Sequence, residues 1–117
     1  MRDHKSLEAW REAREITRIA FKLARFEWRA HSAALFGQLQ RAALSTQLNI
    51  AEGYALYSRR RMLNHLTIAY GSAVESTELL EFGLEEEILP DHSLGDAIQR
   101  SKRCQALLLG LIRRYRN

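Results

Sequence analysis

The stretch "QLQRAALSTQLNIAEGY", residues 38–54, decides the fold class. Its apolar residues recur at steps of three or four, which is the period of an amphipathic helix. Three polar residues, Ser45, Asn49 and Glu52, follow the same steps and therefore line one side of that helix. A polar row beside buried leucine and alanine indicates either a contact with another helix or a site.

The same period continues on both sides of this stretch. We expect helices over about 5–28, 33–57, 59–89 and 94–115, with Ser58 as the N-cap of the third. Pro90 is expected to stop the third helix, and "SLGD" at 93–96 resembles a capping box that starts the fourth. Four long helices with short connections predict an all-α, up-down-up-down four-helix bundle, a single domain over residues 1–117.

Composition sets further limits. The chain has 117 residues, 46% of them hydrophobic and 27% charged, which is typical of one globular domain. No run of about 18 apolar residues is present, and the N-terminus has no apolar core, so we expect a cytoplasmic protein with no membrane contact. Cys104 is the only cysteine and the four histidines are scattered, which predicts no disulfide, no metal and no cofactor.

The polar row has two interpretations. In an antiparallel hairpin that turns near Ser58, equidistant residues face each other, which places Arg41 near Glu75, Ser45 near Gly71 and Asn49 near Leu66. Small residues, Gly53, Gly71 and Ser72, would let the helices approach closely. The structural interpretation is an interhelical hydrogen-bond network of Arg41, Ser45, Asn49, Glu52, Ser72 and Glu75.

The other interpretation is catalytic, with Ser45 as a nucleophile and Glu52 or Glu75 as a general acid or base. No histidine falls at helical spacing from Ser45, and no Gly-x-Ser-x-Gly motif is present. The sequence therefore favours a protein that is not an enzyme.

Charge is segregated along the chain. Residues 1–61 hold 12 Lys/Arg and 6 Asp/Glu, residues 62–99 hold 8 acids and no Lys/Arg, and residues 100–117 hold 6 Lys/Arg and no acid. Candidate phosphate-binding residues form a stripe on the first helix and two clusters, namely Arg11, Arg14, Arg18, Lys22, Arg25 and Arg29, with Arg59, Arg60 and Arg61, and with Arg113 and Arg114. Three interpretations of the stripe stay open: binding of RNA or DNA phosphate, contact with an acidic protein face, and a solvated face paired with Glu8, Glu12 and Glu15.

The first and fourth helices carry more apolar residues than one core stripe needs. Phe21, Phe26 and Trp28 are the surplus on the first, and the run 107–112 covers more than one face of the fourth. This surplus predicts subunit contacts, and the alternative is a broad core face.

Several motifs together resemble one family. They are "KSLEAW" at 5–10, "QLQRAALSTQLNIAEGY" at 38–54, "SRRR" at 58–61 and "IAYGSAVES" at 68–76. The chain resembles the four-helix bundle proteins encoded by intervening sequences of bacterial 23S ribosomal RNA genes, often labelled the S23 family. The family pattern falls on Arg41, Ala42, Ser45, Asn49, Ile50, Ala51, Glu52, Gly53, Gly71, Ser72 and Glu75, and Gln40 stands where a second arginine is common.

The resemblance implies a homo-oligomer, a pentamer in members like this chain, with no assigned activity. It also implies kinship with accessory proteins of diversity-generating retroelements, which bind a reverse transcriptase and nucleic acid. We expect a non-enzymatic binding module or scaffold that contacts RNA or DNA phosphate. The alternative is a protein-interaction adaptor, such as a reverse transcriptase accessory protein, whose basic stripe meets protein.

Overall fold

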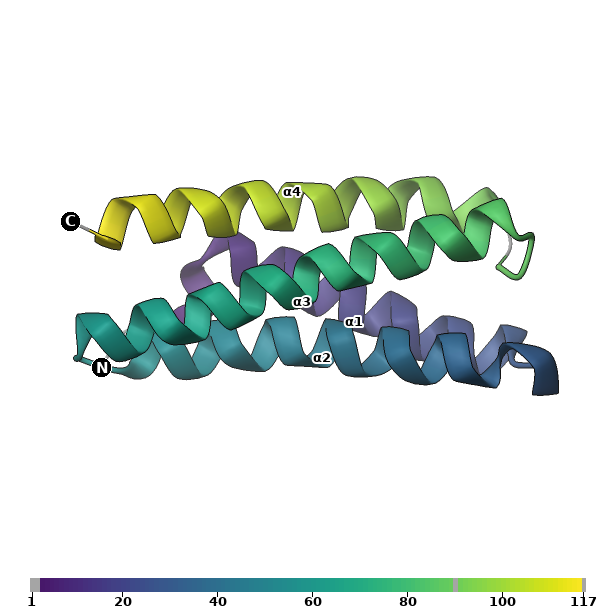
Figure 1. The fold of residues 1–117 in the computed structure, drawn as a ribbon, viewed down its shortest axis with the longest axis horizontal. Helices are drawn as coiled ribbons and strands as arrows, with labels where there is room; N and C mark the ends of the chain where they lie inside the picture. Colours follow the sequence, from purple (N-terminus) through teal and green to yellow (C-terminus); the bar gives the residue numbers. More distant parts are fainter. Residues whose placement is uncertain (1–2, 90, 117) are drawn as a thin grey trace.

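The computed structural model describes residues 3–89 and 91–116, and within these it contains helices and no strand. The helices are α1 (Glu8–Glu27), α2 (Ala33–Ala55), α3 (Arg59–Glu85) and α4 (Asp91–Arg116), with short 3-10 helices η1 (His4–Ser6) and η2 (Ala30–Ser32) before α1 and α2. Each helix packs on its chain neighbours, and α4 closes the ring against α1 (Figure 1). The expectation of an all-α four-helix bundle is confirmed, and both chain ends lie at the same end of a rod 44 Å long and about 20 Å across.

The core forms because each helix buries one apolar stripe. The largest fully buried apolar side chains come from α2, α3 and α4, whereas α1 contributes several alanines that let its neighbours pack closely. Full burial of a leucine, isoleucine or phenylalanine side chain contributes about 1.5–3 kcal/mol, so a few such residues per helix are enough to hold the bundle. The fully buried large apolar residues are Phe36, Leu39, Ile50, Met62, Leu66, Leu80, Leu94 and Leu108.

The connection between α2 and α3 brings these two helices closest together. Ser58 is the N-cap of α3, as expected, and its hydroxyl accepts from the backbone N–H of Arg61 at 3.3 Å. A Cβ on Gly53 would lie 2.7 Å from the Cβ of His65. The close approach that the sequence assigned partly to Gly71 therefore occurs at Gly53, since Gly71 is exposed with nothing within 4 Å of its Cβ position.

The third helix ends earlier than Pro90, which lies outside the described residues. It stops at Glu85, where the N–H of Ile88 bonds the carbonyl of Gly83 and the N–H of Glu87 bonds that of Leu84. Glu87 is in the left-handed region, with φ of 56°, and the pattern is a Schellman motif without its usual glycine. The expectation that Pro90 stops the helix is therefore wrong, because this backbone motif stops it first.

The start of α4 also differs from the expectation. The helix is already formed at Asp91, so Ser93 lies inside its first turn. The side chain of Ser93 lies outside the described part of the structure, so the capping box expected at 93–96 stays a prediction.

The apolar surplus of α4 is absorbed by the core. Leu108 is buried, and Leu107, Leu111 and Ile112 are partly buried against the core, whereas Leu109 is half-buried and lies outside the core cluster. The broad-core alternative therefore holds for α4 except at Leu109. The surplus residues of the first helix are exposed: Phe21 and Phe26 on α1, and Trp28 just after it.

Candidate nucleic-acid interface

The basic stripe lies on the outer face of α1, away from α3. Its cations lie three or four residues apart, so successive side chains are about 4.5–6 Å apart along the axis. From Arg11 to Arg25 the stripe spans about 21 Å, calculated from the helical rise. Arg29 lies beyond the end of α1, in extended backbone before η2, so the expectation that it continues the stripe on this helix is wrong. The five members on α1 are exposed, and so is Arg29: Arg11, Arg14, Arg18, Lys22, Arg25 and Arg29.

The stripe residues make local contacts that hold them on the surface. The Arg11 guanidinium donates to the carbonyls of Lys5 and Ser6, at 3.1 and 3.0 Å. Arg14 lies over the Trp10 ring at 5.6 Å. These contacts hold the two guanidinium groups against neutral partners, so no carboxylate neutralises their positive charges.

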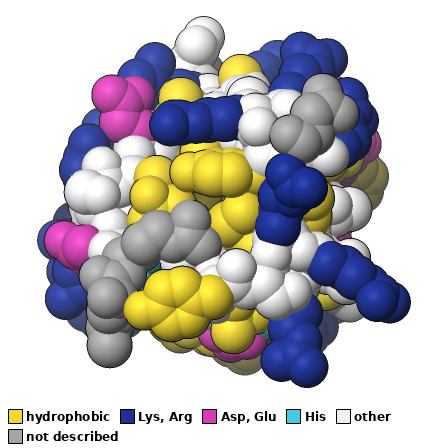
Figure 2. Space-filling view, turned by 90° about the vertical axis from the view of Figure 1, so that its left-hand side faces the viewer, with side chains coloured by type: hydrophobic (Ala, Val, Ile, Leu, Met, Phe, Trp, Pro, Cys, Tyr) yellow, Lys and Arg dark blue, Asp and Glu magenta, His cyan; other side chains and the backbone are white. Residues whose placement is uncertain are grey.

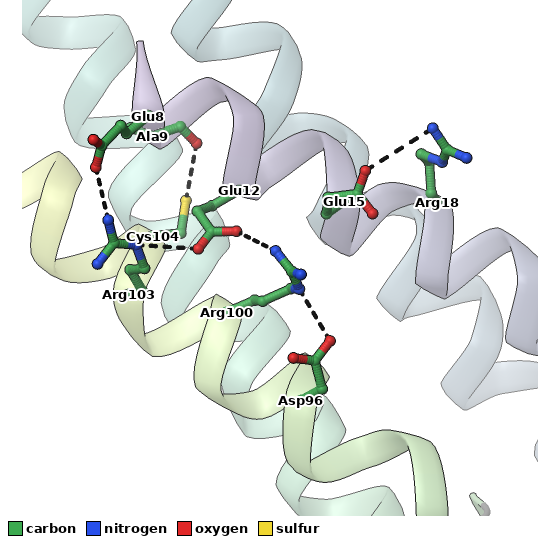
Figure 3. Close-up of polar contacts among 9 residues, drawn as sticks. All are labelled: Glu8, Ala9, Glu12, Glu15, Arg18, Asp96, Arg100, Arg103 and Cys104. Atoms are coloured by element: carbon green, nitrogen blue, oxygen red, sulfur yellow. Dashed lines mark hydrogen bonds and ion pairs between the residues drawn. The ribbon is translucent and has the colours of Figure 1, made fainter.

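Two acidic residues of α1, Glu8 and Glu12, turn away from the stripe. Glu12 accepts from Arg100 at 2.7 Å and pairs with Arg103 at 3.2 Å, and Glu8 accepts from Arg103 at 2.7 Å. Figure 3 shows Glu8 and Glu12 pointing toward α4, while Glu15 and Arg18 lie farther along α1. The expectation that Glu8 and Glu12 pair with cations of their own helix is wrong, because α4 offers them better-placed guanidinium groups.

The contact with α4 forms a continuous ionic cluster. Arg100 also donates to Asp96 at 3.0 Å, and its hydrogen bonds to Asp96 and then Glu12 raise the pKa of its guanidinium. Beside the cluster, the Cys104 thiol donates to the carbonyl of Ala9 at 3.5 Å. Burial raises the pKa of that thiol to about 12, so Cys104 is a neutral packing residue.

Two further basic clusters lie at the end of the bundle that carries both termini. Arg59, Arg60 and Arg61 form the first turn of α3, and Arg113 and Arg114 lie in the last turn of α4. Figure 2 looks onto this end, where Lys and Arg side chains surround a hydrophobic centre and acidic side chains lie at the margins. Cations at the start of α3 oppose its dipole, a local conflict that is typical of functional surfaces.

The polar row on α2 meets α3 as a chain of hydrogen bonds. Ser45 Oγ lies 2.8 Å from Ser72 Oγ, and the Asn49 amide donates to the carbonyl and the hydroxyl of Ser45 at 2.9 and 3.2 Å. Because an amide oxygen can only accept, Asn49 Oδ1 accepts a hydrogen bond from His65 Nδ1 at 2.9 Å. Glu52 lies 3.8 Å from the same His65 nitrogen and is largely exposed.

The outer members of the proposed network stay apart. Arg41 and Glu75 are both exposed and form no ion pair, and the Arg41 guanidinium lies beside Gly37 on its own helix. The expectation of a charged pair there is wrong, because the missing side chain at Gly37 gives Arg41 room to fold back along α2.

Sequence reasoning missed two sets of contacts. One is the pairing of Glu8 and Glu12 with Arg100 and Arg103. A signal existed, since acids spaced by four on the first helix and arginines spaced by three on the last are complementary in an up-down bundle. The other is a polar cluster between α3 and α4, in which Thr77 Oγ1 lies 2.6 Å from Ser101 Oγ and from Gln105 Oε1.

Two negative findings limit the chemistry within residues 3–89 and 91–116. No group of three or more His, Cys, Asp or Glu side chains is placed to hold a metal ion. No described helix combines the length and apolar character needed to cross a membrane.

Comparisons with known proteins agree with the fold. The model of the family described as 23S rRNA-intervening sequence protein matches residues 5–110. A crystal structure of a protein of unknown function from the S23 ribosomal protein family of Bacteroides thetaiotaomicron superposes with a TM-score of 0.81 at 23% sequence identity, covering 90% of this chain and 95% of the other. At that identity the likeness shows the fold alone, and no curated protein matches the chain.

Proposed function

We propose that this chain, which belongs to the family of 23S rRNA-intervening sequence proteins, is a non-enzymatic, self-associating scaffold that binds the phosphate groups of RNA or DNA. The observation that supports this most is the division of charge on α1. The acids Glu8 and Glu12 are neutralised by α4, and the outer face of α1 keeps five cations, with Arg29 just beyond the end of the helix. Among the described residues, Arg18 alone in the stripe has a carboxylate within 4 Å, that of Glu15 at 3.9 Å.

A line of uncompensated cations attracts a polyanion with repeating charges. Each phosphate that a cation contacts releases bound counterions, so the binding is driven largely by entropy and weakens with salt. Phosphate contacts carry no base information, and we therefore expect weak sequence preference.

The geometry of the polar row supports a non-enzymatic role. His65 contacts Asn49 and does not reach Ser45, whose hydroxyl is held by Ser72 and Asn49. A serine nucleophile needs a base within hydrogen-bond reach, and the Ser45 hydroxyl has no histidine or carboxylate partner among the described residues.

Exposed apolar side chains support self-association. Leu48 lies on the outside of α2, and Ile68, Val74 and Phe82 lie on the outside of α3. Exposed apolar side chains on two neighbouring helices offer a surface for a contact between proteins. We propose that copies of the chain meet through α2 and α3, as the pentamer that the sequence resemblance implies.

The test is a salt-dependent titration. A labelled structured RNA is titrated with the wild-type protein and with the triple variant Arg11→Gln/Arg18→Gln/Arg25→Gln, each at about 50 mM and about 200 mM salt. Affinity falls as salt rises, so log affinity plotted against log salt has a negative slope. We expect this slope to become shallower by about 2–3 in the triple variant, since three phosphate contacts are lost. A control, Arg41→Gln/Lys102→Gln, removes cations outside the stripe and should change binding little.

The outcomes separate the candidate functions. No binding by the wild type at low salt would overturn the proposal. Loss of the oligomer in the triple variant, measured as solution mass, would instead assign the stripe to a protein contact. That result would favour the adaptor hypothesis, in which the partner is another protein such as a reverse transcriptase.

A further inference from the structure

Phe21 is an exposed aromatic ring set within the basic stripe. It lies on α1 between Arg18 and Lys22, and 41% of the residue is exposed. Full burial of a phenylalanine side chain contributes about 1.5–3 kcal/mol, and the exposed part of Phe21 forgoes a share of this that a stacking partner would recover.

The ring stands between two hollows in the surface. One runs along α1 and is lined by Glu15, Arg18, Ile19, Phe21, Lys22 and Arg25. The other lies between α1 and α2 and is lined by Arg14, Thr17, Arg18, Phe21, Leu44 and Gln47. Each hollow thus combines one aromatic wall with at least two arginines.

The second hollow also offers a polar group to a ligand. The Gln47 amide is half-buried there and makes no side-chain hydrogen bond to any residue in the described part of the chain. An amide can donate to and accept from the edge of a nucleobase, whereas the Thr17 hydroxyl is already engaged with the carbonyl of Ala13.

We propose that this part of α1 binds single-stranded nucleic acid, with phosphates on the arginines and an unpaired base stacked on Phe21. This rests on the proposed function and narrows it. In a duplex the bases are already stacked on each other, so a convex helix surface reaches phosphates but no base face. Stacking on an aromatic ring beside cations is the usual arrangement of proteins that bind single strands.

The local charge argues against a symmetric contact with a second copy. Arg14, Arg18, Lys22 and Arg25 around the ring face one acid, Glu15, so two such surfaces would repel each other. The remaining alternative is that the acidic outer face of α3 from a second copy, which carries Phe82, covers this surface. The experiment distinguishes that contact from nucleic-acid binding.

The experiment compares single strands with a duplex. Fluorescence anisotropy is measured with 20-nucleotide single-stranded RNA, single-stranded DNA and a duplex of the same length. We expect each single strand to bind at least about 10-fold more tightly than the duplex. A difference in affinity between single-stranded RNA and single-stranded DNA would indicate a contact with the 2′-hydroxyl. Phe21→Ala should weaken single-strand binding about 5- to 100-fold without changing the salt slope, because a stacking contact and no phosphate contact is lost.

Two variants control for a merely structural effect. Phe21→Trp keeps an aromatic face and should retain binding. Phe26→Ala removes another phenylalanine of α1, 63% exposed, that lines neither hollow, and it should leave binding unchanged.

Each result has a defined meaning. Equal binding of duplex and single strand with no effect of Phe21→Ala would overturn this inference while leaving the proposed phosphate binding intact. A fall in solution mass in both Phe21→Ala and Phe82→Ala would show that α1 meets α3 of another copy, which also overturns it. If no nucleic acid binds the wild type, both proposals fail together.

Discussion

The α2–α3 and α1–α4 interfaces hold their helices in register by different physics. Between α2 and α3 the contacts are neutral hydrogen bonds through Ser45, Ser72, Asn49 and His65. Between α1 and α4 they are charged, with Glu12 in contact with two arginines. A short turn connects α2 to α3, whereas α1 and α4 are the first and last long helices and are far apart in the sequence.

This difference bears on function. Neutral contacts on α2 and α3 leave the charges of those helices to solvent or partners. Between α1 and α4, the ionic cluster pairs Glu8 and Glu12 with arginines of α4. These two acids are therefore not available to neutralise the cations on the outer face of α1. The structural role of Glu8 and Glu12 therefore creates the surface that we assign to nucleic acid.

The largest expected effect comes from the close approach at Gly53. Gly53→Ala places a Cβ 2.7 Å from the Cβ of His65 and 3.2 Å from the carbonyl of Met62, where neither neighbour can move freely. We expect a loss of about 2 kcal/mol in unfolding free energy, the net of overpacking and the gain in helix propensity. Chemical denaturation measures it.

The matched control is Gly71→Ala, at an exposed helical position with open space around the Cβ. It should stabilise the protein by up to about 1 kcal/mol. Equal effects at the two positions would show that α2 and α3 are not closest at Gly53.

The next effect tests the charged interface. Glu12→Gln keeps the shape but removes the charge that Arg100 and Arg103 share, at a side chain only 14% exposed. We expect a loss of about 1–2 kcal/mol, because hydrogen bonds between charged groups are stronger than neutral ones and the arginines are partly screened by solvent. The loss should shrink in 1 M salt, measured by thermal or urea unfolding.

Glu15→Gln supplies the comparison. Glu15 lies 3.9 Å from Arg18 with both side chains largely exposed, so its removal should cost close to nothing. A Glu12→Gln penalty that is independent of salt would argue that packing, and not charge, joins α1 to α4.

The contrast also explains what the sequence could predict. In a hairpin, counting outward from the turn places facing residues, and the arithmetic put Ser45 and Asn49 within one residue of their partners Ser72 and His65. No such counting links Glu12 to Arg100, which are 88 residues apart in the chain. That pairing depends on the rotation of both helices about their axes, which the apolar stripes fix only coarsely.

Two other differences between the expected and the observed structure have local causes that the pattern of apolar and polar residues does not predict. The end of α3 is set by a left-handed Glu87 where a glycine is usual, and the fold-back of Arg41 depends on Gly37. The four helices and their core stripes followed from periodicity alone, because burial of one face per helix leaves few other arrangements.

A smaller effect is expected at the neutral interface. Asn49→Leu removes hydrogen bonds to Ser45 and His65, but the site is only part-buried, so water can replace them. We expect a loss of about 1 kcal/mol that is insensitive to salt. Asn64→Leu, on the exposed face of α3, is the control, and an unchanged Asn49→Leu protein would mean that the row does not hold the helices in register.

The reactivity of the Cys104 thiol offers a further way to compare the two interfaces. Its ionisation is not expected to affect the free energy of unfolding at neutral pH. Its pKa of about 12 lies above the ordinary 9.0, so unfolding favours the thiolate, and stability falls only as the pH rises from about 9 toward 12. At pH 8 the thiolate fraction is about a thousand-fold lower than for a free thiol, so a disulfide reagent should react very slowly with the native protein.

The same reaction reports local opening beside Ala9. Because Cys104 donates to the carbonyl of Ala9 across the α1–α4 contact, Glu12→Gln should speed labelling, both by loosening that contact and by removing a charge that raises the thiol pKa. Asn49→Leu should not speed it beyond the change in global stability, since its interface lies on α2 and α3. Equal acceleration in the two variants would mean that the bundle opens as one unit and that the charged interface is not a separate point of weakness.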